Sequence, residues 1–248
     1  MWRVSLAAVS TPIVRVAGLH KTYGRGDAQV HALRGIDLEI PRGELTAIMG
    51  PSGSGKSTLM HCVVGLEKAS QGRVEIDDKV VTDMSQRQLT RLRRDSIGFI
   101  FQAYNLVPTL SAEENICLPA RIARRPIDRA RFEAIVQTMG LADRLDHRPA
   151  ELSGGQQQRV ACARALLTGP DVVFADEPTG NLDSSASEQL LSFIRASVDD
   201  FEQTVVMVTH EPDAAAYADR VIFLADGTIR SELVSPTRDT VLDALREL

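Results

Sequence analysis

Residues 45–58, Leu-Thr-Ala-Ile-Met-Gly-Pro-Ser-Gly-Ser-Gly-Lys-Ser-Thr, decide the fold. Leu45 to Met49 predicts a buried strand, and Ser57 to Val64 predicts a helix that stops near Gly65. The glycine-rich loop between them lets backbone N–H groups converge on phosphate oxygens, and the helix amino terminus adds partial positive charge. In this G-x-x-x-x-G-K-S pattern the lysine reaches the β- and γ-phosphates and the serine ligates Mg²⁺. We expect a nucleotide-binding loop formed by Gly50, Pro51, Ser52, Gly53, Ser54, Gly55, Lys56, Ser57 and Thr58.

A second group of candidate residues ends another apolar run, Val172-Val173-Phe174-Ala175-Asp176-Glu177. A buried strand rarely ends on two adjacent acids without a partner for their charge. Beside a phosphate loop, we expect Asp176 to hold Mg²⁺ through water and Glu177 to polarise an attacking water as general base. The alternative is an acidic helix-capping turn before Pro178, and the phosphate loop makes it the weaker interpretation.

Further short strands alternate with helical stretches along the chain. Aliphatic or β-branched runs at 171–175, 204–208 and 221–224 have the pattern of a parallel sheet covered on both faces. Strand-like runs at 13–16 and 38–40 flank a glycine-rich break and predict an antiparallel edge sheet. Between Leu110 and Leu167 apolar residues recur at helical spacing without a clear strand. We therefore expect an α/β core with an antiparallel edge and an inserted helical lobe.

The composition excludes several classes of protein. Of 248 residues 44% are hydrophobic, and 28 basic against 33 acidic side chains give a formal net charge of −5, which argues against disorder and against nucleic acid as a partner. No apolar run approaches the roughly 20 residues of a bilayer-spanning helix. Met1 to Ser10 lacks a signal-cleavage pattern, so we expect a cytoplasmic chain. We expect Cys62, Cys117 and Cys162 to be reduced core thiols rather than ligands or nucleophiles.

A turn of small residues lies before the helix expected at 157–167. The turn reads Leu152-Ser153-Gly154-Gly155-Gln156, and it offers a glycine-opened helix terminus to anionic oxygens. Alone it carries little weight. Together with the phosphate loop and the paired acids it resembles the ATP-binding-cassette (ABC) ATPase family, in which L-S-G-G-Q is the signature sequence. The resemblance extends from about Ile13 to Ser235.

The resemblance implies roles for further residues. Tyr23 matches the aromatic residue that stacks on adenine in such ATPases, with an ordinary turn tyrosine as the alternative. Gln102 matches the glutamine that senses Mg²⁺ and the attacking water, and His210 matches the histidine that contacts the γ-phosphate. Asp183 matches the loop that contacts the opposite subunit. The implied catalytic residues are Glu177, His210 and Gln102, the implied Mg²⁺ ligands are Ser57, Gln102 and Asp176, and the implied cofactors are ATP and Mg²⁺.

The family's geometry also implies a homodimer and a division of the chain. Two copies are expected to pack head to tail, with each ATP between the phosphate loop of one chain and Ser153, Gly154, Gly155 and Gln156 of the other. We expect one P-loop NTPase domain of the ABC ATPase type over residues 12–235. Its nucleotide-binding core and antiparallel β part are expected in 12–100 and 160–235, and its helical subdomain in about 101–159. Residues 236–248 are expected to form a C-terminal helix that packs on the core through Val241, Leu242, Leu245 and Leu248.

Residues 101–110 and 177–183 resemble the branch of lipoprotein-releasing, macrolide-efflux and cell-division ABC ATPases. This resemblance implies a separate transmembrane permease subunit as partner and a peripheral location on the inner face of the cell membrane. Tyr104, Leu106, Val107 and Leu110 are apolar for a loop, and they predict either a docking groove for that partner or a locally buried loop. Basic clusters at 87–94 and 121–131 face anionic headgroups, an acidic partner or solvent.

Three functions stay open at this point. The favoured one is the energy-supplying subunit of a membrane transporter. The second is a mechanical regulator, in which closure of the ATPase dimer pulls on a membrane partner and no cargo crosses. The third is a soluble ABC ATPase of DNA repair or translation, which is disfavoured because such chains carry long coiled coils, zinc modules or two cassettes.

Overall fold

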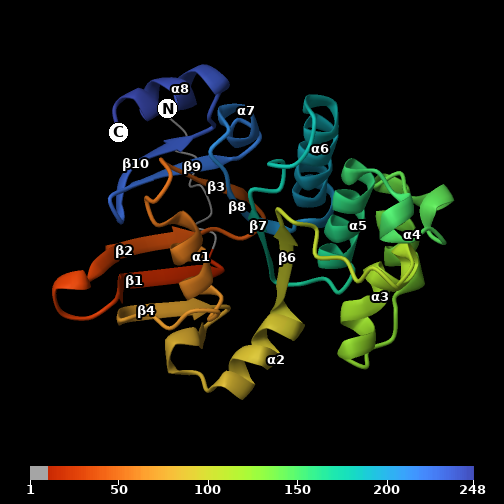
Figure 1. Ribbon diagram of the computed structural model, residues 1–248, viewed down its shortest axis with the longest axis horizontal. Coiled ribbons are helices and arrows are strands. Elements are labelled where there is room, and N and C mark those ends of the chain that lie inside the picture. Colours follow the sequence, from red (N-terminus) through yellow and green to blue (C-terminus); the bar gives the residue numbers. More distant parts are fainter. Residues whose placement is uncertain (1–10) are drawn as a thin grey trace, which may run out of the picture.

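Two β-sheets organise residues 11–248, the part of the chain that the computed structural model describes (Figure 1). The strands are β1 (Val14–Tyr23), β2 (Val30–Ile40), β3 (Leu45–Met49), β4 (Gln71–Ile76), β5 (Lys79–Val80), β6 (Ile97–Phe101), β7 (Val172–Asp176), β8 (Thr204–Val208), β9 (Arg220–Ala225) and β10 (Thr228–Val234). The larger sheet has the order β10-β9-β3-β8-β7-β6, with β10 antiparallel at one edge and the other five strands parallel. The smaller sheet, β2-β1-β4-β5, is antiparallel throughout.

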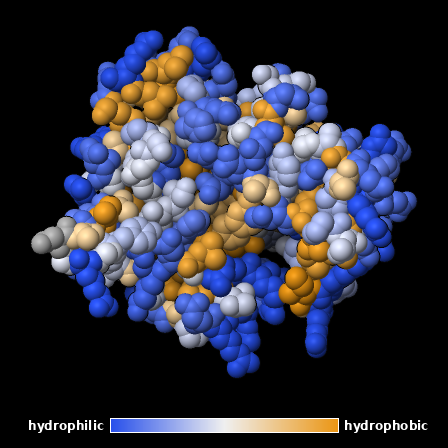
Figure 2. Space-filling view, viewed as in Figure 1, coloured by the Kyte–Doolittle hydropathy of each residue, from blue (hydrophilic) through white to orange (hydrophobic). Residues whose placement is uncertain are grey.

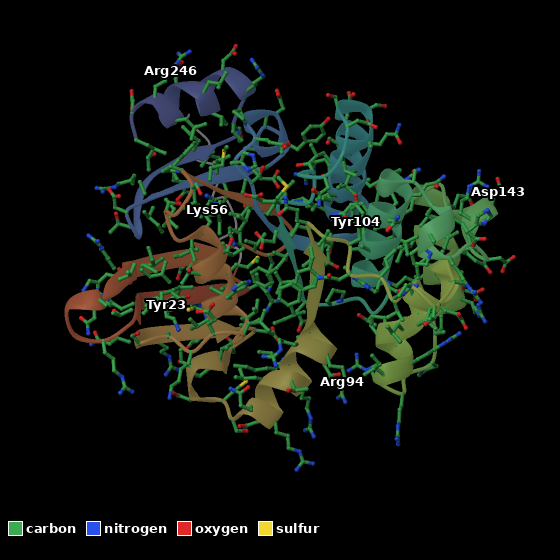
Figure 3. All side chains as sticks on the ribbon, in the orientation of Figure 1. Tyr23, Lys56, Arg94, Tyr104, Asp143 and Arg246 are labelled. Atoms are coloured by element: carbon green, nitrogen blue, oxygen red, sulfur yellow. The ribbon has the colours of Figure 1, made fainter. Side chains whose placement is uncertain are left out.

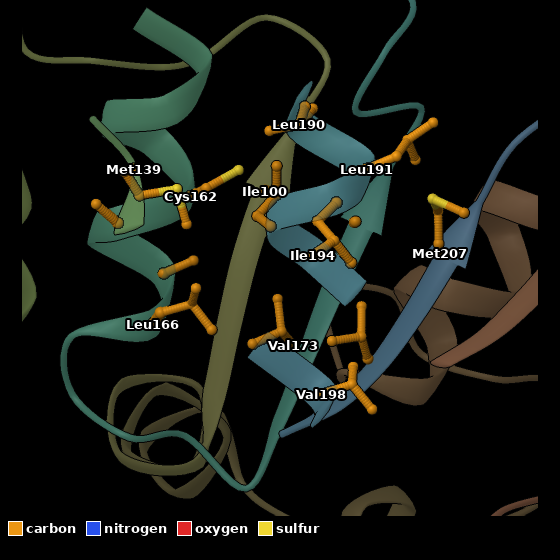
Figure 4. Close-up of a cluster of buried hydrophobic side chains, with 14 of the residues drawn as sticks. Ile100, Met139, Cys162, Leu166, Val173, Leu190, Leu191, Ile194, Val198 and Met207 are labelled. Carbon is orange, nitrogen blue, oxygen red and sulfur yellow. The ribbon is translucent and has the colours of Figure 1, made fainter. Parts of the chain in front are cut away.

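Helices cover both faces of the larger sheet because its strands are apolar on both sides. The helices are α1 (Lys56–Val63), α2 (Gln86–Ser96), α3 (Ala112–Ile122), α4 (Arg129–Thr138), α5 (Gly154–Leu166), α6 (Ser184–Phe201), α7 (Pro212–Ala215) and α8 (Arg238–Arg246). Alternate residues of β8 enter different clusters: Val206 and Val208 pack with α1 and the smaller sheet, whereas Met207 packs with α5 and α6. Figure 4 shows this second cluster, where Ile194 of α6 lies among side chains of β6, β7 and β8.

The inserted lobe consists of α3, α4 and α5 and contains no strand, which confirms the prediction for this region. Each of these helices begins at a side-chain cap, supplied by Ser111, Asp128 and Ser153 respectively. Phe132 and Ile135 of α4 are buried in the same cluster as Val160 of α5. The lobe therefore continues the core of the larger sheet instead of forming a separate hydrophobic unit.

The predicted α/β class with an antiparallel edge is confirmed, but several element limits differ. Strands β4, β5, β6 and β10 were not expected from the sequence. Helix α5 begins at Gly154, three residues before the expected start, because the Ser153 hydroxyl accepts from the backbone N–H of Gln156 at 3.3 Å and the Gln156 side chain accepts from the N–H of Ser153 at 2.9 Å. The signature turn is thus the first turn of a helix.

The predictions for the cysteines and for the C-terminal helix can also be compared with the structure. All three cysteines are buried and free, and burial raises the pKa of Cys62 to about 11 and of Cys162 to about 12. Val241 of α8 is buried in the core and Leu245 packs against it, whereas Leu248 is 39% exposed. No helix in residues 11–248 is both long and apolar enough to cross a bilayer. The expectation for Met1 to Ser10 lies outside the described residues, and the division at 100 and 160 stays a prediction.

Candidate nucleotide-binding site

The loop between β3 and α1 has a backbone that only glycine fits at two positions. Gly50 has a φ of +151°, and a Cβ there would lie 1.9 Å from the carbonyl oxygen of Leu224. Gly55 has a φ of +105°, and a Cβ there would lie 2.6 Å from the carbonyl oxygen of Ala32. Gly55 is also the residue before α1, and no side chain in the described chain caps this helix terminus. The first-turn N–H groups of α1 therefore keep the capacity to bind phosphate.

Lys56 lies inside this loop. It is only 8% exposed, and its Nζ donates to the carbonyl oxygens of Gly50 at 2.8 Å and Pro51 at 2.9 Å. Burial lowers the pKa of Lys56, and the negative charges of Glu177 and Asp176 oppose that shift. The ammonium group is thus placed by the loop itself, at the start of α1 (Figure 3).

A cavity of about 790 Å³ lies over the loop, within the size range of ligand pockets. Two predicted catalytic residues from distant parts of the chain, Glu177 and His210, line it together with the loop. Among residues 11–248 the lining is Ala32, Gly50, Pro51, Ser52, Gly53, Gly55, Lys56, Ser57, Thr58, Glu177, His210, Leu245 and Leu248. Ser54 does not line the cavity: it is 2% exposed, and its hydroxyl has no hydrogen-bond partner among the described residues.

Glu177 and His210 face each other across the ends of β7 and β8. The Glu177 N–H donates to the carbonyl of Val208 at 2.9 Å, which prolongs the strand pairing by one residue. The His210 Nδ1 lies 3.1 Å from the Glu177 Oε1. Glu177 has a φ of +44°, a left-handed conformation that is uncommon for a residue with a side chain and typical of functional sites. The carboxylate is therefore held at the cavity by its own backbone and by the histidine.

Asp176 and Ser57 offer oxygen ligands for a cation. Burial raises the pKa of Asp176 and Glu177 raises it further, whereas the His61 ring, the nearby Ser57 hydroxyl and Lys56 lower it. Mg²⁺ prefers such hard oxygen donors and takes only one or two carboxylates where phosphates and water complete its shell. No group of three or more His, Cys, Asp or Glu side chains in residues 11–248 forms a metal cage. Ser57 and Asp176 thus fit Mg²⁺ that arrives with a phosphate group.

Tyr23 lies beside the cavity and not in its lining. It ends β1, is 38% exposed, and its hydroxyl lies 3.5 Å from the hydroxyl of the cavity residue Thr58. The same hydroxyl donates to the carboxylate of Glu67. Figure 3 shows Tyr23 and Lys56 on the same side of the molecule. The position suits a residue at the rim of a nucleotide site.

Gln102 is also outside the cavity lining. The side-chain amide of Asn181 donates to the backbone carbonyl of Gln102 at 2.8 Å. A Cβ at Gly180 would lie 2.7 Å from the Gln102 Nε2, so the glutamine side chain rests on this glycine. The structure thus brings Gln102 to the loop after Glu177 and does not bring it to the phosphate loop.

The signature residues line a different cavity, of about 380 Å³. Its lining is Ser153, Gly154, Gly155, Arg159, Asn181, Leu182, Asp183, Ser185, Ala186 and Gln189. Gln156 is not among these residues, because its side chain closes the capping box of α5. Asp183 caps α6, where its Oδ1 accepts from the N–H of Ala186 at 2.8 Å. None of the residues that the structure describes lines both this cavity and the one over the phosphate loop.

Two residues of α5, Gln158 and Arg164, join this helix to the segments that follow β6 and β7. Neither was predicted from the sequence. The Gln158 side chain is fully buried, and its Nε2 donates to the carbonyls of Phe101 at 3.3 Å and Pro178 at 2.9 Å. The Arg164 guanidinium donates to the carbonyls of Tyr104 at 2.8 Å and Asn105 at 2.6 Å. A polar residue on the apolar face of a predicted helix was the available signal for Gln158.

A phosphate-cradling loop beside an acid that can activate water is what P-loop nucleoside triphosphatases have in common, and the parallel sheet with β3 and α1 at its centre puts this chain in that class. Residues 33–180 match the family described as ABC transporter. The chain belongs to this family, and it is an ATP-hydrolysing cassette, as the sequence analysis predicted.

Known relatives agree with this assignment. The macrolide export ATP-binding/permease protein MacB of Marinobacter nauticus is 46% identical over 228 residues, which are 91% of this chain and 35% of MacB. The bacitracin export ATP-binding protein BceA of Halalkalibacterium halodurans is 41% identical over 89% of this chain and 88% of its own. A post-hydrolysis dimer of the ATP-binding cassette MJ0796 with ADP and Pi superimposes with a TM-score of 0.81 at 39% identity, covering 90% of this chain and 99% of that one.

The chain spans only 35% of the length of this macrolide-export relative. Relatives of the predicted macrolide-efflux branch are thus found. The roles of individual site residues stay predictions.

Proposed function

We propose that this chain works as one half of a head-to-tail ATPase dimer, with each ATP between the phosphate-loop cavity of one copy and the signature turn of the other. The observation that carries this proposal is the separation of the two cavities on one chain. The first holds the loop, Glu177 and His210, and the second holds Ser153, Gly154 and Gly155 at the amino terminus of α5. A second copy supplies the half that each cavity lacks, and the dimeric form of the relative MJ0796 supports this arrangement.

Within the shared site we assign roles from the geometry. Lys56 and the N–H groups of α1 bind the β- and γ-phosphates. Glu177 takes a proton from the attacking water. His210, whose Nδ1 lies 3.1 Å from the Glu177 Oε1, orients the Glu177 carboxylate and contacts the γ-phosphate. Ser57 and Asp176 would hold Mg²⁺, which would neutralise charge on the phosphate oxygens. The family resemblance adds Gln102 as a third ligand, although its side chain rests on Gly180 in this structure. ATP stabilises the closed dimer, and hydrolysis removes the bridging charge.

Ser153→Ala tests whether the signature turn acts on ATP. The hydroxyl is expected to bind the γ-phosphate of the partner's ATP, and a hydrogen bond to a charged group contributes about 1.5–3 kcal/mol, so turnover should fall about tenfold or more. The ATP affinity of the dilute chain should stay unchanged, because Ser153 is outside the phosphate-loop cavity. Steady-state hydrolysis and equilibrium binding measure the two quantities.

Ser111→Ala is the matched control. Ser111 caps α3 through the same reciprocal hydrogen bonds by which Ser153 caps α5, so both variants lose a comparable cap, worth about 1 kcal/mol. Ser111→Ala should lower the stability of the protein and leave turnover unchanged. Equal turnover in the two variants, or a loss of affinity in dilute Ser153→Ala, contradicts a shared site.

We further propose that a transmembrane permease docks in a groove between the core and the helical lobe. Phe99 and Phe101 of β6 and Leu118, Pro119 and Ile122 of α3 line this groove of about 430 Å³. Figure 2 shows apolar atoms on both sides of the hollow in the lower half of the view. An apolar surface of this kind favours an amphipathic helix of a partner. This docking gives the chain its peripheral place on the inner face of the membrane.

The loop at 104–110 contributes Asn105 to the lining of this groove, but none of its four apolar residues. Tyr104, Leu106, Val107 and Leu110 are half-buried, and the fully buried Asn115 side chain holds the loop through the Val107 N–H at 2.7 Å and the Leu110 carbonyl at 3.1 Å. The locally buried alternative therefore fits these four residues better. Much of the two basic clusters is also engaged within the chain, through Arg93 with Gly65, Arg94 and Arg125 with Asp95, Arg121 with Glu114, Arg129 with Glu113, and Arg131 with Leu166.

The permease assignment is supported by MacB, in which a similar cassette forms part of an ATP-binding/permease protein. The names of MacB and BceA favour export over purely mechanical regulation. A cargo assay with the cognate permease separates these two functions.

Ile122→Asp should detach the chain from its permease. Ile122 is 63% exposed in the groove, so a carboxylate there leaves folding intact and opposes an apolar partner helix. We expect the share of the chain that sediments with membranes of the native cell to fall several-fold. Val30→Asp changes a residue of equal exposure, 62%, on β2 and should not alter sedimentation. Full retention of Ile122→Asp on the membranes contradicts the groove.

A further inference from the structure

A cluster of charged and polar side chains surrounds the hydroxyl of Tyr23 outside the phosphate-loop cavity. Tyr23 donates to the Glu67 Oε2, and the Lys21 Nζ lies 3.3 Å from the same carboxylate oxygen. His61 of α1 approaches the other oxygen, with 3.6 Å between its Nδ1 and the Glu67 Oε1. Glu67 therefore joins the end of β1 to α1, the helix that starts at the phosphate loop.

Lys21 also fixes one face of the tyrosine ring. Its Nζ lies 4.7 Å from the ring centroid and donates to the carbonyl of Lys68 at 2.9 Å. The Lys21 side chain is only 13% exposed, so this cation is held in place between the ring and the turn that carries Glu67. One ring face is covered by a cation and the hydroxyl edge is bound to a carboxylate, which leaves little freedom for the ring to rotate.

A ring held in this way binds a base more tightly than a free one. An exposed tyrosine at the end of a strand loses rotamer freedom when a base stacks on it, and that loss weakens binding. Tyr23 is 38% exposed, so part of its surface stays open while its hydroxyl is fixed. The hydrogen bond from Tyr23, ahead of the charge of Lys21, lowers the pKa of Glu67, which agrees with an ionised carboxylate at this place.

We propose that Glu67 is a positioning residue for the nucleotide base: it holds the Tyr23 hydroxyl so that the ring is already oriented for a purine when ATP binds. The proposal rests on the proposed role of Tyr23 as the stacking platform. Glu67 itself does not line the nucleotide cavity and acts through Tyr23. Its effect should therefore depend on the base and not on the phosphates.

The experiment compares two ligands, Mg²⁺-ATP and base-free Mg²⁺-tripolyphosphate, by equilibrium binding to the full chain. Glu67→Ala and Tyr23→Phe should each raise the Kd for ATP about fivefold, since each removes one charge-assisted hydrogen bond. The double variant should lose no more affinity for ATP than either single variant. Glu67→Gln should lose less than Glu67→Ala, because the amide oxygen still accepts from the hydroxyl. The Kd for tripolyphosphate should not change in any of them.

Two further variants separate this proposal from simpler outcomes. Glu75→Ala removes another ion-paired carboxylate, 22% exposed and bound to Arg73 and Arg15, and should leave both affinities unchanged. Tyr23→Ala should weaken ATP about tenfold or more, since stacking on an aromatic ring is worth about 1–3 kcal/mol. If Tyr23→Ala has no effect, the platform itself is wrong and the inference falls with it.

If Tyr23→Ala weakens ATP binding but Glu67→Ala does not, the stacking role of Tyr23 is supported and the role of Glu67 is overturned. The proposal is also overturned if Glu67→Ala loses as much affinity for tripolyphosphate as for ATP, or if the losses of affinity in the double variant are additive. Either result makes Glu67 a structural residue only.

Discussion

Replacing Glu177 by glutamine should trap ATP in a dimer that does not turn over. The amide keeps the size of the carboxylate and can still meet His210, but it cannot accept a proton from water. General-base catalysis contributes about 10²–10⁴-fold, so kcat should fall at least about a hundredfold. Light scattering of the purified variant in Mg²⁺-ATP should report twice the mass of one chain, and wild type should return to the smaller mass as it consumes ATP.

Glu211→Gln is the control for this substitution. Glu211 follows His210 in the chain and accepts from the Thr179 hydroxyl at 2.9 Å, and it is not part of the cavity lining. A glutamine oxygen can accept the same hydrogen bond, so turnover should remain near that of wild type. Near-normal turnover in Glu177→Gln removes Glu177 from the base role. A variant that binds ATP and stays monomeric at high concentration contradicts the shared site.

The backbone at Glu177 explains why this test is specific. Its left-handed φ of +44° is held by the N–H bond to Val208 and by a turn in which the Gly180 N–H donates to the Glu177 carbonyl at 3.1 Å. Neither contact involves the side chain. The substitution therefore leaves the loop conformation unchanged and alters only the proton-accepting group.

The parts of the fold that the sequence predicts are those with a local signal. The strand at Leu45–Met49 and that at Thr204–Val208 have the limits that their apolar runs indicate, because both are buried on two faces. The edge strand β10, by contrast, has one buried partner and exposed residues such as Val234, so its pattern is weak. Strand β6 is a short run directly after α2, with no turn residue to mark its start.

The residues of the candidate site also differ in whether a local sequence signal identifies them. Lys56 and Glu177 are found from short motifs because their chemistry requires neighbours in the sequence. Gln158 and Glu67 are not, since their partners lie far along the chain: Gln158 meets Phe101, 57 residues away, and Glu67 meets Tyr23, 44 residues away. Such contacts depend on how sheets and helices pack, which no local pattern contains.

Replacing Lys56 by alanine should weaken ATP binding itself. The ammonium is buried in the loop, where a charge-assisted contact to phosphate is worth about 1.5–3 kcal/mol, so the Kd for Mg²⁺-ATP should rise about tenfold to a hundredfold. Isothermal titration measures this change. Lys56→Met is the companion variant: it keeps most of the apolar stem and removes only the charged end, so an equal loss in both variants assigns the effect to the charge.

The same substitution also separates binding from closure. In a Lys56→Ala, Glu177→Gln double variant the base is absent as before, but the phosphate is no longer held, so the trapped dimer should not form at ATP concentrations that saturate Glu177→Gln. In the proposed dimer, closure needs the γ-phosphate as a bridge between the two copies, and a ligand shifts an equilibrium only by its difference in affinity for the two states. Unchanged affinity in Lys56→Ala, or a stable dimer in the double variant, shows that the loop at residues 50–57 is not what grips the triphosphate.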